Sequence, residues 1–207
     1  DLHSFPTRRS SDLFVKLPVQ FAGIIAEHQH TRKSASLFDV SHMGQVLIYP
    51  ESGNLADAAA ALETLIPASV AGLKEGRQRY GLFTDENGGV LDDLMFANHG
   101  DRYFLVVNAA RSDHDLGLLR TLEGVTVEHI TDRSLLALQG PRAEEALAGL
   151  IPDAAGLRFM DSRVLDWGGV TVWVSRSGYT GEDGFEISVP SITKRSEERR
   201  VGKECRS

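Results

Sequence analysis

Two neighbouring aspartates, Asp92 and Asp93, lie inside the otherwise apolar run of residues 90–97, Val-Leu-Asp-Asp-Leu-Met-Phe-Ala. Such a run predicts a strand that is covered on both faces. Because side chains alternate along a strand, Asp93 shares one face with Met95, and Asp92 shares the other with Leu94. Burying a carboxylate costs free energy unless it is hydrogen-bonded or paired with a cation. Both aspartates are therefore functional candidates, the alternative being that one of them caps a turn at the strand end.

A third carboxylate, Glu186, follows a glycine-rich loop at residues 177–184. Phe185 and Ile187 alternate onto one strand face, which leaves Glu186 on the other face, beside the loop. A carboxylate can accept two parallel hydrogen bonds from a planar donor edge such as that of a pterin or a guanine. The competing interpretation is an ordinary solvent-facing strand residue. The loop lacks the Lys-Ser/Thr ending of a phosphate-binding loop and leads into a strand rather than a helix.

Other residue types suggest no further site. His28 and His30 are two residues apart in a predicted helix and so point to different faces, and no carboxylate follows at metal-ligand spacing. The Ser41-His42 pair lacks the strand–turn pattern of a nucleophile elbow. The single cysteine, Cys205, stands near the end of the chain. We therefore expect neither a metal site, nor a disulfide, nor a nucleophilic triad.

Composition limits the class of protein. The 207 residues are 42% hydrophobic and 25% charged, which is typical of a globular protein. No apolar run approaches the ~20 residues of a membrane helix. The formal net charge of −7 argues against a nucleic-acid surface, where a basic stripe is expected. We expect a soluble protein of a reducing compartment, with neither a membrane nor a nucleic acid as partner.

The two ends differ from the middle of the chain. Residues 1–15 show no helical or strand periodicity, and residues 192–207 form a basic, charge-rich run. Both segments resemble translated sequencing-adapter sequence, so we expect foreign, disordered flanks around one partial domain at residues 16–191. The alternative is a natural linker at the start and a natural basic tail at the end.

The elements that must position the carboxylates follow from periodicity and turn signals. Strands are expected over residues 45–49, 80–84, 90–97, 102–108, 135–138, 170–175 and 185–189. Helices are expected over residues 21–36, 55–65 and 113–122, and another opens at Pro141. Strands that come as hairpins with helices between them predict an α+β fold with antiparallel sheets.

Five motifs in a fixed order carry a family resemblance. They are Leu-Pro-Val-Gln-Phe at 17–21, Ser-Leu-Phe-Asp-Val-Ser-His-Met at 36–43, Gly-Gly-Val-Leu-Asp-Asp-Leu at 88–94, Leu-Ala-Leu-Gln-Gly-Pro at 136–141 and Gly-Tyr-Thr-Gly-Glu-Asp-Gly-Phe-Glu-Ile at 178–187. Over residues 16–191 the chain resembles the aminomethyltransferases of the glycine cleavage system, the T-proteins. Each motif alone is of moderate specificity, whereas five in register are specific.

The resemblance implies a reaction and its partners. Enzymes of this family take the aminomethyl group from the lipoyl arm of H-protein, release ammonia and pass the one-carbon unit to tetrahydrofolate, forming methylenetetrahydrofolate. Tetrahydrofolate is then a substrate, no metal is needed, and lipoylated H-protein is the partner. The resemblance further leads us to expect a monomer, in the cytoplasm of a bacterium or in the mitochondrial matrix of a eukaryote.

The resemblance also assigns roles to residues. Asp93, rather than Asp92, matches the family's catalytic carboxylate, which holds and polarises the attacking folate amine. Glu186 matches the residue that binds the pterin edge. Four further positions match the lining of the folate pocket: Tyr179, Tyr80, Asn108 and Met43.

The implied fold has three domains around a central folate channel, of which this chain holds most of the first two. Missing are an arginine-bearing segment after the last strand and the C-terminal β domain, so we expect this chain by itself to be inactive. Two alternatives share the fold. A folate-binding iron–sulfur assembly factor would carry a cysteine near the end of the folate domain, and residues 16–191 contain none. The folate domain of a demethylating flavoenzyme would need a flavin domain upstream.

Overall fold

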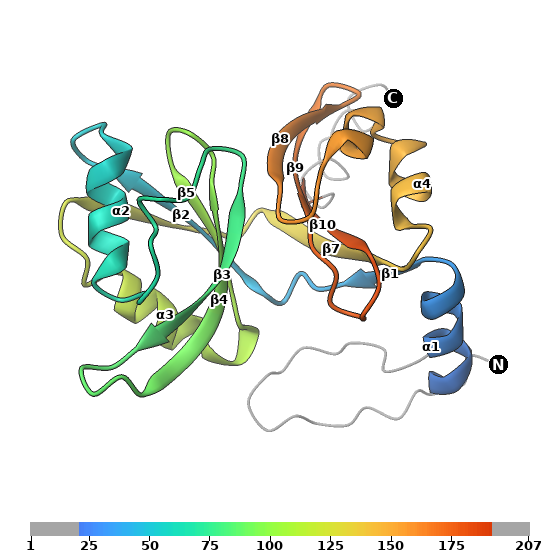
Figure 1. Ribbon diagram of the computed structural model, residues 1–207, viewed down its shortest axis with the longest axis horizontal. Coiled ribbons are helices and arrows are strands. Elements are labelled where there is room, and N and C mark those ends of the chain that lie inside the picture. Colours follow the sequence, from blue (N-terminus) through green and yellow to red (C-terminus); the bar gives the residue numbers. More distant parts are fainter. Residues whose placement is uncertain (1–20, 192–207) are drawn as a thin grey trace, which may run out of the picture.

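The computed structural model describes residues 21–191, which form two five-stranded antiparallel sheets flanked by helices (Figure 1). The α+β class with antiparallel sheets is therefore confirmed. The expected foreign flanks, residues 1–15 and 192–207, and Cys205 lie outside the described residues. Among the described residues no helix is long and apolar enough to cross a membrane.

The first sheet has the strand order β3-β4-β5-β2-β6. Its strands are β2 (Gly44–Pro50), β3 (Gln78–Thr84), β4 (Val90–Asn98), β5 (Tyr103–Val107) and β6 (Val125–Ile130). The helices α2 (Leu55–Glu63) and α3 (Ser112–Leu119) cover one face, with a 3-10 turn, η1 (Ala109–Arg111), before α3. Fully buried side chains such as Ile48, Leu62 and Phe96 fill the core between this sheet and its helices.

The second sheet has the strand order β1-β7-β10-β9-β8. Its strands are β1 (Ser36–Asp39), β7 (Arg133–Gln139), β8 (Ser162–Trp167), β9 (Val170–Arg176) and β10 (Gly184–Pro190). It is accompanied by α1 (Ile24–Lys33), α4 (Ala143–Ala148) and the 3-10 turn η2 (Pro152–Gly156). Leu147 of α4 and Phe185 and Ile187 of β10 belong to its hydrophobic core.

The chain crosses between the sheets twice, and the two crossings lie side by side. One crossing joins β1 to β2 and the other joins β6 to β7, while β1 pairs with β7 and β2 pairs with β6. Between these ladders the Val40 amide donates to the Leu135 carbonyl (3.0 Å) and the Leu135 amide donates to Ser41 Oγ (3.1 Å). Gln45 Nε2 then donates to the Arg133 carbonyl (3.1 Å). The joint is thus a continuous two-stranded ribbon, which sets how one sheet faces the other.

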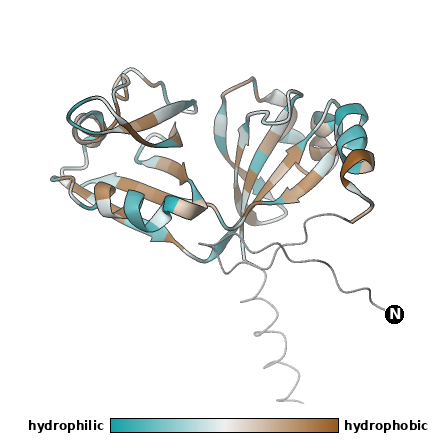
Figure 2. Cartoon of the chain, turned by 90° about the horizontal axis from the view of Figure 1, so that it is seen from below, coloured by the Kyte–Doolittle hydropathy of each residue, from teal (hydrophilic) through white to brown (hydrophobic). Residues whose placement is uncertain are grey.

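A third hydrophobic cluster fills the space between the sheets beside this joint. It contains Phe104 of β5 and Trp173 of β9, whose rings meet edge to face at 5.0 Å between centroids. The Arg133 guanidinium lies 4.0 Å from the centre of the Trp173 ring. Hydrophobic residues run along the strands of both sheets (Figure 2). Packing between the sheets therefore adds to the stability that the joint provides.

All seven predicted strands and four predicted helices are present, with shifted ends. The predicted helix 21–36 is wrong at its end, because residues from Ser36 onward pair with β7 as strand β1. The helix expected to open at Pro141 starts at Ala143, after a turn at Gly140. Strands β1, β6 and β8 were not predicted. β6 and β8 carry polar or exposed residues at many positions, and β1 is a short strand held by pairing with a distant strand.

Gly140 is expected to be irreplaceable. Its φ of +134° disfavours other residues, and an added Cβ would lie 2.3 Å from the Ser34 carbonyl oxygen. We expect Gly140→Ala to lower the free energy of unfolding by about 3 kcal/mol or more, measured by urea denaturation. Gly53→Ala is the matched control, because Gly53 also has a positive φ but no atom within 4 Å of an added Cβ. Equal losses for the two variants would contradict the steric argument.

Candidate functional site

A cavity of about 390 Å³ lies between the two sheets. Its walls come from the first crossing, from β3, β4 and the end of β5, and from β7, β10 and the glycine-rich loop. The lining residues are Phe38, Val40, Met43, Tyr80, Asp93, Leu94, Met95, Val106, Asn108, Ala137, Gln139, Tyr179, Thr180 and Glu186. Most of this surface is apolar, with a few polar groups that converge, which is the usual make-up of a small-molecule site.

All six residues to which the family resemblance assigned a role line this one cavity, whereas the other candidate, Asp92, does not. The first sheet contributes Tyr80, Asp93 and Asn108, and the second sheet contributes Glu186; these are joined by Tyr179 from the loop and Met43 from the crossing. The alternation predicted for β4 is seen at Asp93 and Met95, which line the cavity, and at Phe96, which belongs to the core under α2 and α3. Leu94 belongs to the same core and also borders the cavity. Asp92 points to that second face.

Asn108 links the two aspartates. Its Nδ2 donates to Asp93 Oδ1 (2.7 Å) and to Asp92 Oδ1 (3.0 Å). The Asp93 amide also donates to Asp92 Oδ1 (2.9 Å). One Asp93 oxygen is therefore held by an amide, and the carboxylate is presented to the cavity in a fixed orientation.

The two aspartates differ in their surroundings. Burial opposes the charge on Asp92, but hydrogen bonds from the Asn108 side chain and the Asp93 amide outweigh it and lower the pKa of Asp92. On the cavity side, Tyr80 lies near Asp93. Loss of hydration and then the interaction with Asp93 raise the pKa of Tyr80. Asp93 thus lies between the Asn108 amide and the Tyr80 side chain.

Glu186 is a buried carboxylate, with 7% of its surface exposed. On β10 it lies between Ala137 of β7 and Ser175 of β9. Burial raises its pKa to about 7, although a hydrogen bond from the Tyr179 hydroxyl opposes the shift. Loss of hydration and the nearby charge of Glu186 raise the pKa of Tyr179 in turn. The solvent-facing alternative for Glu186 is therefore excluded.

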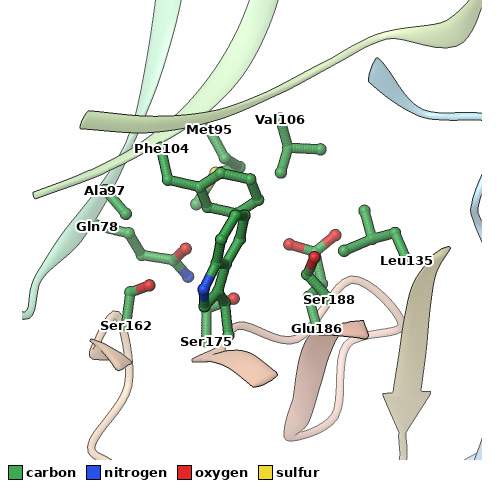
Figure 3. Close-up of a pocket in the computed structure, with 11 residues that line it drawn as sticks. Gln78, Met95, Ala97, Phe104, Val106, Leu135, Ser162, Ser175, Glu186 and Ser188 are labelled. Carbon is green, nitrogen blue, oxygen red and sulfur yellow. The ribbon is translucent and has the colours of Figure 1, made fainter. Parts of the chain in front are cut away.

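A second, water-sized chamber of about 10 Å³ adjoins the cavity and shares Glu186, Met95 and Val106 with it. Side chains from the two sheets point toward one another across this chamber, with the Glu186 carboxylate directed to its centre (Figure 3). Gln78 and Ser175 add polar groups to the wall. Glu186 therefore lies at the junction of an apolar cavity and a small chamber with a mixed polar and apolar lining.

The glycine-rich loop is anchored by side chains to which the sequence assigned no role. Gln139 accepts a hydrogen bond from the Tyr179 amide (2.7 Å) and donates to the Ser177 carbonyl (3.2 Å). Arg176 pairs with Asp183 and with Glu144 of α4. The signal for Gln139 was its place in the Leu-Gln-Gly-Pro motif, next to a glycine. These contacts hold Tyr179 at the cavity wall.

The histidines that the structure describes form no cluster of metal ligands. His28 and His30 are exposed on α1, and His42 lies in the first crossing. Within residues 21–191 no three His, Cys, Asp or Glu side chains gather as metal ligands.

The chain was compared with models of known protein families. The family model described as the GCVT N-terminal domain matches residues 11–197. The chain belongs to this family. The T-protein resemblance of the five motifs is thereby confirmed.

Relatives agree with this assignment. The chain is 39% identical over 189 residues to the mitochondrial aminomethyltransferase of Dictyostelium discoideum, covering 85% of this chain and 46% of that protein. It is 42% identical over 181 residues to the aminomethyltransferase of Listeria monocytogenes serotype 4b, covering 84% and 49%. The crystal structure of glycine cleavage system aminomethyltransferase T from Bartonella henselae superposes with a TM-score of 0.74 at 35% identity, covering 89% and 50%. The chain thus spans about half the length of these relatives.

Glu186 is expected to make stability depend on pH. Its pKa is raised from 4.5 to about 7, so the stability that the protonated form contributes is complete below pH 4.5 and is lost as pH rises through about 7. Glu186→Gln cannot ionise. We expect it to unfold like the wild type near pH 4.5 and to be more stable by about 2–3 kcal/mol at pH 8, in urea titrations.

Glu128→Gln, on an exposed position of β6, is the control and should show no such divergence. The free energies of unfolding of Glu186→Gln and wild type are compared at pH 4.5 and pH 8. If their difference is the same at both pH values, Glu186 is not a buried, titrating group.

Proposed function

We propose that this chain forms the folate-binding part of an aminomethyltransferase of the glycine cleavage system. The observation that carries the proposal is that Asp93, Glu186 and the four other residues matched to the family's motifs meet at one cavity between two sheets. The family match and the relatives named aminomethyltransferase support it. The reaction is transfer of the aminomethyl carbon from the lipoyl arm of H-protein to tetrahydrofolate, with release of ammonia.

Asp93 is the proposed catalytic carboxylate. Asn108 Nδ2 holds one of its oxygens at 2.7 Å, and Tyr80 approaches from the cavity side. A carboxylate fixed in this way can accept a hydrogen bond from the folate amine and point the nitrogen lone pair at the methylene carbon. It can also receive the proton that this nitrogen loses as the new carbon–nitrogen bond forms.

Glu186 is the proposed anchor for the pterin ring. Its buried carboxylate can accept two parallel hydrogen bonds from the amino-pyrimidine edge. Such donors favour the charged form of Glu186, which burial otherwise disfavours. Binding of the ring therefore supplies hydrogen-bond donors to the buried Glu186 carboxylate and offsets the cost of its charge.

The remaining wall suits the rest of the ligand. Tyr80 and Tyr179 offer flat aromatic surface, and each is about half exposed. Met43, Val40 and Phe38 complete an apolar wall along the first crossing. A pterin with its attached aromatic ring needs this combination of flat apolar contact and a few hydrogen bonds.

Lipoylated H-protein is the proposed donor of the one-carbon unit, and the protein is proposed to act as a monomer. The relatives include mitochondrial proteins from Dictyostelium discoideum and Schizosaccharomyces pombe and bacterial proteins from Listeria. Because these relatives come from mitochondria and from bacteria, we propose that the protein acts in the mitochondrial matrix or in the bacterial cytoplasm.

The proposal can be tested in a protein of full family length. The chain is joined to the C-terminal half of the Listeria monocytogenes aminomethyltransferase, with the intact Listeria enzyme as reference. We expect ammonia release from aminomethyl-loaded H-protein that depends on tetrahydrofolate. A folded chimera that binds tetrahydrofolate but releases no ammonia, beside an active reference, would overturn the proposed activity.

Asp93→Asn in this chimera is expected to lower kcat by about 100-fold or more while changing the Kd of tetrahydrofolate little, because a contact made in the transition state is lost. Asp92→Asn is the matched control. Asn at position 92 still offers an oxygen to Asn108, so most activity should remain. Similar kinetics for the two variants, measured as ammonia release, would reject the assignment of Asp93.

Glu186→Gln is expected to weaken tetrahydrofolate binding by about 30- to 1000-fold, because the new NH₂ group faces the donor edge of the pterin. This range corresponds to about 2–4 kcal/mol for a lost charge-assisted hydrogen bond and an unpaired buried group. Isothermal titration calorimetry on the chimera measures it, with the exposed Glu128→Gln as control. An unchanged Kd would remove Glu186 from the folate site.

A further inference from the structure

Asp115 is a buried carboxyl group that the proposed reaction does not use. It lies on α3, on the far side of β4 from the cavity, and none of its surface is exposed. Its Oδ1 lies 3.2 Å from Nδ1 of the neighbouring His114. Its side chain is also within hydrogen-bond reach of Asp92.

The second oxygen of each of these two carboxyl groups is buried without a hydrogen-bond partner in the described part of the chain. These atoms are Asp92 Oδ2 and Asp115 Oδ2. Two ionised carboxylates cannot satisfy each other, since both only accept hydrogen bonds. A single proton on the pair makes one carboxyl group a donor and the other an acceptor, which two ionised carboxylates cannot be.

We propose that Asp115 is a positioning residue, which in its protonated form donates a hydrogen bond to Asp92 and so holds the Asp92–Asn108–Asp93 chain in place. This role rests on the proposed catalytic function of Asp93. The chain of contacts is continuous: Asp92 Oδ1 accepts from Asn108 Nδ2 (3.0 Å), and the same nitrogen donates to Asp93 Oδ1 (2.7 Å). Helix α3 is thereby connected to the cavity through one strand.

The charges around the pair place the proton on Asp115. Burial, followed by the nearby Asp92, raises the pKa of Asp115 to about 6, against the hydrogen bond from His114. Asp92 keeps its charge because Asn108 and the Asp93 amide donate to it, and Arg111 lies near enough to favour the charge. The opposite directions of the two shifts are those of a carboxyl pair that shares one proton.

The shared proton makes the arrangement sensitive to pH. The stability that protonated Asp115 contributes is complete below pH 3.8 and is lost as pH rises through about 6. Asp115→Asn carries a permanent NH₂ donor in the same place, so it should keep the low-pH arrangement at every pH. Asp115→Leu removes the donor and leaves Asp92 Oδ2 buried without a partner.

The first experiment measures the proton itself in the chain as given. An infrared difference spectrum at pH 5, wild type minus Asp115→Asn, should show the carbonyl stretch of a protonated carboxylic acid, which disappears by pH 8. In urea titrations, the folding equilibrium constant of wild type relative to Asp115→Asn should fall by about a hundredfold between pH 4 and pH 8. Asp113→Asn, exposed on the same helix, is the control and should show neither effect.

The second experiment measures the connection to the cavity. The side-chain NH₂ signals of Asn108, followed by ¹⁵N NMR at pH 5, should be unchanged in Asp115→Asn and should shift and exchange faster with solvent in Asp115→Leu. In the chimera assayed at pH 5, where Asp115 is protonated, Asp115→Leu should lower kcat by about tenfold with little change in the Kd of tetrahydrofolate, and Asp115→Asn should keep the wild-type kcat.

The outcomes separate this inference from the proposed function. Any of three results would overturn the positioning role, whatever the chimera does. The carbonyl band could be missing, the ratio of folding equilibrium constants could be independent of pH, or the Asn108 signals could be unchanged in Asp115→Leu. A wild-type chimera without transfer activity would instead count against the proposed function, while the infrared and NMR results still decide whether Asp115 holds Asn108.

Discussion

The cavity exists because the chain crosses between two sheets twice and the crossings are hydrogen-bonded to each other. β1 pairs with β7 and β2 with β6, and Val40, Ser41 and Leu135 bridge the interval between these ladders. A single connection would leave the sheets free to turn about it. A two-stranded ribbon removes that freedom, and the packing of Phe104 against Trp173 holds the sheets on one side of it. The distance between the facing walls, and hence the site, depends on this joint.

Strand alternation then decides which side chains meet. β4 presents Asp93 to the cavity and Asp92 to the helix side, and β10 presents Glu186 to the cavity while its neighbour Phe185 enters the core under α4. The two carboxylates of the cavity are placed in different surroundings. Asp93 accepts a hydrogen bond from the Asn108 amide and lies near Tyr80, whereas Glu186 is almost fully buried. One is suited to handling a proton and the other to binding a cationic or donor-rich edge.

Unfavourable burial is concentrated at the places where function is proposed. Glu186 and Asp115 are buried carboxyls with raised pKa values, and each lies next to a group that offsets part of the cost. Elsewhere buried charges are paired, as where Arg77 and Arg158 meet Asp161. Strained or poorly satisfied groups persist when the surrounding structure holds them in place. Here the sheets and the anchored glycine-rich loop supply that support.

Residue order alone was enough to predict the fold class, most strands, the face of β4 that carries Asp93 and, through five motifs, the family. These follow from local periodicity and from residue types that occur together in order. Three features could be found only in the folded chain: strands β1, β6 and β8, the anchoring of the loop by Gln139, and the approach of Asp115 to Asp92. Each depends on contacts between residues far apart in the chain, and neither propensity nor spacing encodes such contacts. The cavity is the clearest case, because its walls come from segments that meet only when both crossings are made.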